Sequence, residues 1–87
     1  MTWQEAVDGF RSLLKICEEA GVEPLDARIW RPSPPDSHAI EIRVAPEGES
    51  DPDTVATVTR LLDRLEQTGG ELGFHVRRSM FSILLTA

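Results

Sequence analysis

The sequence predicts an α+β protein, a two-layer sandwich in which two helices cover one face of an antiparallel sheet. Two stretches carry apolar residues at helical spacing, and shorter stretches carry them at every second position, as strands do. Each strand-like stretch has one apolar and one polar side, which is typical of an antiparallel sheet covered on one face only. The predicted order is αββαβ, or αββαββ if the C-terminal stretch contains two strands.

The first helix is expected to begin after Thr2. Thr2 and Glu5 match a capping box, in which each residue satisfies a free backbone N–H of the other. Gly21 is expected to end the helix. We expect Trp3 to pack in the core or at a hinge, and Cys17 to be a buried structural thiol. The apolar side of this helix consists of Trp3, Ala6, Val7, Phe10, Leu13, Leu14, Cys17 and Ala20.

Two strands are expected next, over residues 25–30 and 38–45. In the first, Leu25, Ala27 and Ile29 alternate with Asp26, Arg28 and Trp30. In the second, His38, Ile40, Ile42 and Val44 alternate with Ala39, Glu41, Arg43 and Ala45. The intervening residues 32–37 contain three prolines and predict a loop, so the two strands form an antiparallel hairpin.

The second helix is predicted from its capping residues. Asp51 is suited to the N-cap and Pro52 to the first helical position. One apolar stripe follows, made of Val55, Val58, Leu61, Leu62 and Leu65. Gly69 and Gly70 are expected to supply the left-handed cap that ends the helix.

The C-terminal stretch reads as strand, with an irregularity at residues 77–79. Leu72, Phe74 and Val76 occupy even positions, whereas Phe81, Ile83 and Leu85 occupy odd positions. A strand cannot change phase without a bulge or a turn. Because these residues include no Gly, Asn or Asp, we favour a bulge over a tight hairpin turn.

This order of elements resembles a ferredoxin-like βαββαβ unit that lacks its first strand. The resemblance implies a gap in the usual strand order, to be filled by the C-terminal stretch or by a neighbouring subunit. It implies nothing about function.

Length and composition predict a single domain over residues 1–87 in the cytoplasm. Fifteen acidic and nine basic residues give a net charge of −6, which argues against direct binding of nucleic acid. One cysteine excludes an internal disulfide and fits a reducing compartment. The first residues lack the features of a signal peptide, and no apolar run reaches the roughly 20 residues that span a membrane.

The sequence offers no set of residues for catalysis or metal binding. His38 and His75 are the two imidazoles, and with Cys17 buried they do not complete a metal site. The glycines of residues 69–73 follow a helix and precede a strand, the reverse of a phosphate-binding loop. Glu41 and His75 would form an acid–base pair if the strand register brought them together. We therefore expect no catalytic residue, metal or cofactor.

We place the candidate binding site on the polar face of the sheet. Tryptophan and arginine are enriched among the residues that dominate protein interfaces. Trp30 has an alternative role, covering the proline loop or stacking on Arg28 or Arg43. The predicted partner-binding residues are Arg28, Trp30, Glu41, Arg43, His75 and Arg77.

The leading functional hypothesis is a non-enzymatic protein–protein interaction module that acts as an inhibitor, immunity factor or adaptor. Because the acidic residues concentrate in the helices and connectors, these surfaces are an alternative contact, blocking a basic or nucleic-acid-binding partner in a salt-sensitive complex. A second hypothesis is a homodimeric small-ligand binder or enzyme that uses His75, Glu41 and Arg43. A third is a structural subunit that assembles through its sheet.

Overall fold

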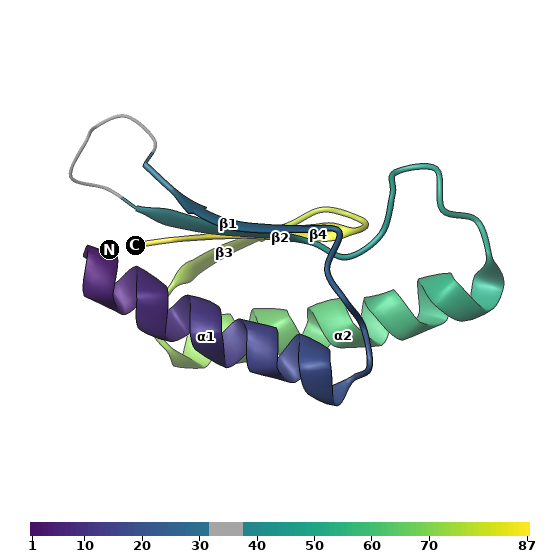
Figure 1. Ribbon diagram of the computed structural model, residues 1–87, viewed down its shortest axis with the longest axis horizontal. Helices are drawn as coiled ribbons and strands as arrows, with labels where there is room; N and C mark the ends of the chain where they lie inside the picture. The colour runs from purple at the N-terminus through teal and green to yellow at the C-terminus, as the bar shows by residue number, and fades with distance from the viewer. Residues whose placement is uncertain (32–37) are drawn as a thin grey trace.

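The computed structural model describes residues 1–31 and 38–87 of the chain. Its elements are α1 (Trp3–Glu19), β1 (Asp26–Trp30), β2 (Ala39–Arg43), α2 (Pro52–Glu71), β3 (His75–Arg78) and β4 (Ser82–Thr86). The strands form one antiparallel sheet in the order β1-β2-β4-β3, and both helices lie on the same side of it (Figure 1). The predicted α+β sandwich is confirmed in its αββαββ form. The loop predicted over residues 32–37 lies outside the described residues.

Both helices begin where the capping residues predict. The Glu5 N–H donates to Thr2 Oγ1 at 3.2 Å, and the Thr2 N–H donates to Glu5 Oε1 at 3.1 Å, which completes the capping box. At the start of α2, the Thr54 N–H donates to Asp51 Oδ2 at 2.9 Å, with Pro52 in the first turn. These bonds lower the pKa of the Glu5 and Asp51 carboxyl groups, because they favour the ionised form.

The prediction that Gly69 and Gly70 end the second helix is wrong. Helix α2 continues to Glu71, and the left-handed position after it is Gly73, with φ +88°. Gly69 is buried against the sheet, where a Cβ atom would lie 2.5 Å from Leu85 Cδ2 and 3.1 Å from Val76 Cγ2. The residue at position 69 is therefore small because the helix touches the sheet there.

The favoured bulge at residues 77–79 is also wrong, because the chain reverses into a hairpin. Arg78 lies opposite Ile83, and residues 79–81 form the turn between β3 and β4. The Ser79 N–H donates to the Ser82 carbonyl oxygen at 3.0 Å, and the two serine hydroxyl groups bond to each other. The hydroxyl pair adds a side-chain link across a turn that contains serine but no Gly, Pro, Asn or Asp.

The position of β4 bears on the ferredoxin-like resemblance. β4 lies between β2 and β3, so the C-terminal stretch occupies the place beside β2. Every adjacent pair of strands is antiparallel, so β2 and β3, which α2 connects, both run antiparallel to β4 and parallel to each other. The ferredoxin-like description is not confirmed.

The core lies between the sheet and the two helices. Its fully buried large side chains are Leu13, Cys17, Ile40, Ile42, Leu61, Leu62, Leu65, Ile83 and Leu85. The predicted burial of Cys17 is confirmed at 1% exposure, and this burial raises the pKa of its thiol. Trp3 differs from the prediction, since 57% of its surface is exposed and its ring meets His38 edge-on at 5.6 Å.

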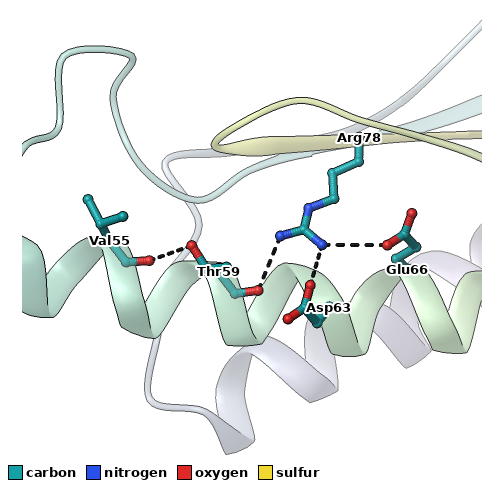
Figure 2. Close-up of polar contacts among 5 residues, drawn as sticks. All are labelled: Val55, Thr59, Asp63, Glu66 and Arg78. Carbon is teal, nitrogen blue, oxygen red and sulfur yellow. Dashed lines mark hydrogen bonds and ion pairs between the residues drawn. The ribbon is translucent and has the colours of Figure 1, made fainter.

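Arg78 joins the edge strand β3 to helix α2, as Figure 2 shows. Its guanidinium donates to Asp63 and, at 3.5 Å, to Glu66 Oε1. It also donates to the Thr59 carbonyl oxygen at 3.3 Å. The bond that Arg78 donates to Asp63 is the main reason that the pKa of Arg78 is raised. Because alternate side chains of a strand point to opposite faces, the side chain of Arg78 points toward the helices. The two carboxylates compensate its positive charge there.

Candidate functional site

The six predicted site residues all lie on the sheet face that the helices leave uncovered. They alternate along their strands with residues that pack against the helices, and successive strand side chains point to opposite faces. Figure 1 shows both helices below the sheet and no described element above it. We call this surface the open face; its residues are Asp26, Arg28, Trp30, Glu41, Arg43, His75, Arg77, Ser82, Leu84 and Thr86, whereas Ala39 on the same side of β2 is fully buried.

The strand register arranges the open face in rows across the sheet. Arg28 lies opposite Glu41, Glu41 opposite Leu84, and Leu84 opposite Arg77. This row therefore crosses all four strands with two arginines at its ends.

Arg28 is held on both sides of its guanidinium. Its Nε and Nη2 atoms donate to Glu41 Oε1 at 3.0 and 2.8 Å. Its Cζ atom lies 5.6 Å from the centroid of the Trp30 ring, within the range of a cation–π contact. The predicted stacking of Trp30 on Arg28 is confirmed, and the three side chains form one pre-ordered group.

Trp30 is only half-buried, yet its indole nitrogen is shielded from solvent. Within the described part of the chain, the Trp30 Nε1 atom has no hydrogen-bond acceptor. Leaving a buried donor unpaired costs about 1–3 kcal/mol.

Arg43 begins a second row. It lies opposite Asp26 on β1 and opposite Ser82 on β4. Its Nη1 atom is 3.6 Å from Glu47 Oε1, a loose ion pair at the surface. Such exposed pairs contribute little, so Arg43 can turn to another anion at small cost.

His75 and Arg77 stand on the edge strand β3, and both are exposed. His75 lies opposite Thr86, whereas Glu41 lies two strands away in the row of Arg77. Two strand spacings amount to roughly 10 Å, so Glu41 and His75 do not form an acid–base pair within one chain. Arg77 makes no ion pair with any other described residue.

Leu84 belongs to the same surface, although the sequence did not predict it. It is half-buried between Glu41 and Arg77 and points away from the core that holds Ile83 and Leu85. The available signal was its even position in a strand whose odd positions are buried. Its apolar side chain gives the centre of the open face a hydrophobic contact.

Charge is divided between the two sides of the molecule. The open face carries three arginines and one histidine against two carboxylates, those of Asp26 and Glu41. The two helices carry eight acidic residues against four basic ones. An acidic chain thus presents its arginines on the sheet and its carboxylates on the opposite layer.

Two surface hollows lie at the margin of the predicted site or away from it. One of about 230 Å³ lies at the β3–β4 turn and is lined by Arg43, Glu47 and residues 79–82. Another of about 400 Å³ lies beside residues 21–24 and has a mostly apolar lining. Among residues 1–31 and 38–87, no three His, Cys, Asp or Glu side chains are grouped to hold a metal ion. Neither described helix is long and apolar enough to cross a membrane.

Comparisons of the chain with protein-family models, curated proteins and solved structures give no match. The functional argument therefore rests on the geometry and chemistry of the open face.

Proposed function

We propose that this protein is a non-enzymatic protein–protein interaction module, an inhibitor, immunity factor or adaptor, that binds its partner through the open face. The observation that carries the proposal is the packing of both helices on one side, which leaves Trp30, Leu84 and three arginines together on the other. We place it in a reducing, cytoplasmic setting, in keeping with its single buried cysteine.

The residue types and their order support binding to a protein. Tryptophan and arginine dominate interface energies when they are held in well-packed positions. The contacts of Arg28 with Glu41 and Trp30 fix these side chains before binding, which reduces the entropy lost on association. Leu84 adds apolar area at the middle of the same row.

The chemistry of the open face favours an acidic contact on the partner. Arg77 has no carboxylate partner among the described residues, and Arg43 is held only loosely by Glu47. An acidic patch on the partner would pair with both side chains and speed association at low salt. The alternative is that the acidic helices bind a basic partner, and the experiment below distinguishes this from binding at the open face.

The test compares two variants with the same change of charge. Arg43→Glu/Arg77→Glu alters the open face, and Arg11→Glu/Arg60→Glu alters exposed helix positions that make no ion pair with the described residues. A partner captured with the wild-type chain is identified, purified and titrated against each folded variant. We expect the open-face variant to bind at least about 30-fold more weakly, the loss typical of a hot spot. The helix variant should bind like the wild type.

A third variant, Glu18→Lys, reverses an exposed acidic charge on α1. Loss of binding in this variant together with full binding by the open-face variant would place the working surface on the acidic helices. Equal binding by all variants would refute the open-face proposal.

A further inference from the structure

The two edges of the sheet are formed by β1 and β3, and neither is paired with another described strand. An edge strand presents free N–H and C=O groups that can pair with a strand of another chain. The helices pack beneath the sheet, and β1 stands at its front edge in Figure 1. The question is which edge has side chains suited to such pairing.

The charges along β1 and its flanks are antisymmetric about Ala27. Asp26 and Arg28 lie one position on either side within the strand, and Glu23 and Arg31 lie four positions on either side, beyond its ends. When two copies of a strand pair antiparallel about a two-fold axis, residues equally distant from the axis face each other. An axis at Ala27 therefore places Asp26 of each copy opposite Arg28 of the other.

The apolar residues fit the same axis. Leu25 lies opposite Ile29 of the second copy, two positions from the axis. Leu25 directly precedes β1 and is 59% exposed, and its N–H donates to the Arg43 carbonyl oxygen of β2 at 2.9 Å. A second copy would cover this exposed side chain.

The edge strand β3 is poorly suited to pairing with a second copy. Pairing two copies about Val76 would give Arg77 no acid opposite it, and pairing about Arg77 would set two arginines against each other. Like charges directly opposite are destabilising. Arg78 is tied to α2 beneath this edge, and an inward charge is a device that discourages edge pairing.

We propose that a second copy of this chain docks on β1, antiparallel and with the two-fold axis at Ala27. The two sheets join into one continuous sheet, and both open faces lie on the same side of it because facing residues share a face. This inference does not depend on the proposed function, since the open face stays uncovered. It doubles the area of that face.

Charge exchange tests the pairing. In the variant Asp26→Arg, positions 26 and 28, which face each other across the axis, are both positive. In the variant Arg28→Asp/Glu41→Lys, both positions are negative, and the exchange keeps an ion pair between positions 28 and 41 within the chain. Each variant is checked for folding by circular dichroism and for self-association by sedimentation equilibrium. We expect the wild-type chain to dimerise and each variant alone to have a dissociation constant at least about tenfold higher. An equimolar mixture of the two variants should form a heterodimer.

A disulfide tests the position of the axis. Directly opposite residues of antiparallel strands have Cα atoms about 4.5–5.5 Å apart, within disulfide reach. Ala27→Cys should therefore oxidise rapidly to a covalent dimer, while Arg77→Cys on the β3 edge serves as the control. The native Cys17 is buried and does not compete.

Three results would overturn the pairing. They are a wild-type chain that stays monomeric at about 1 mM, a mixture of the two charge variants that remains monomeric, and an Ala27→Cys variant that crosslinks no faster than Arg77→Cys. Binding of an identified partner is measured separately with the open-face variant, so either proposal can fail while the other stands.

Discussion

Gly69 and its neighbour Gly70 are both helical, but only Gly69 touches the sheet. A Cβ at Gly69 would lie 2.5 Å from Leu85 Cδ2, and Leu85 is fully buried and has little room to move. We expect Gly69→Ala to destabilise the fold by about 1–3 kcal/mol, because overpacking outweighs the better helix propensity of alanine. Urea unfolding measures the change.

Gly70→Ala is the matched control, since nothing lies within 4 Å of a Cβ at that position. It should stabilise the protein by at most about 1 kcal/mol, the propensity gain alone. A stabilising Gly69→Ala would show that the helix and sheet are not in close contact.

Asp51 makes stability depend on pH through its N-cap bonds. The bonds from Thr54 lower the pKa of Asp51 in the folded state, so its contribution is complete above the unfolded pKa and is lost as pH falls through the folded value. Asparagine caps helices about as well and does not titrate. We expect Asp51→Asn to lose less stability than the wild type as pH falls below about 4.

The measurement is urea unfolding of both proteins between about pH 6 and pH 2. Glu5 behaves in the same direction but is present in both chains, so it cancels in the difference. Parallel stability curves for the two proteins would contradict a folded-state role for the Asp51 carboxylate.

At the level of elements, Arg78 fixes strand β3 to helix α2. Its side chain is 23% exposed, and it donates to Asp63, to Glu66 and to the Thr59 carbonyl group (Figure 2). We expect Arg78→Ala to destabilise the fold by about 1–2 kcal/mol, between the values for exposed and buried charged bonds. The neighbouring Arg77→Ala, which breaks no such contact, should change stability by less than about 0.5 kcal/mol.

A double-mutant cycle with Asp63→Ala assigns the loss to the ion pair. The effects of Arg78→Ala and Asp63→Ala should be less than additive, because either change removes the same bond. Full additivity would mean that the bond to Asp63 contributes nothing and that Arg78 acts through Glu66, Thr59 or the packing of its alkyl chain.

The elements that the sequence predicts well are those whose causes are local. The caps at Thr2 and Asp51 and the alternation in β1 and β2 depend on neighbours in the chain, and the structure confirms them. The polar sides of the strands likewise identified six of the residues of the open face. Their assembly into rows needed the register, which no local pattern supplies.

The elements that were predicted wrongly have causes elsewhere in the fold. Gly69 resembles a helix stop, and only its contact with Leu85 on a distant strand explains it. The β3–β4 turn is closed by a backbone bond and a hydroxyl bond between Ser79 and Ser82, without the Gly, Asn or Asp that marks a tight hairpin turn in a sequence. Leu84 was missed because an apolar residue in an apolar run does not reveal which face it occupies.

On the scale of the whole molecule, the helical layer and the sheet have different roles. The helices provide one side of a core that is continuous from α1 to β4, and they carry most of the acidic charge. The sheet provides the other side of the core and turns its arginines outward. A change on the open face therefore leaves the core intact, whereas a change at the helix–sheet contact should be felt throughout the molecule.

The rate at which the Cys17 thiol is labelled shows whether the helices and the sheet unfold together. Its thiol is buried in α1 and its pKa is raised by that burial, so a disulfide reagent reacts only when the chain opens. Gly69 lies on the other helix, but both residues border one continuous core. If opening is global, Gly69→Ala should speed the labelling of Cys17 about tenfold for each 1.4 kcal/mol of stability lost, and Gly70→Ala should slow it. Identical labelling rates in all three proteins would mean that α1 opens locally beside the hollow at residues 21–24, without α2 and the sheet.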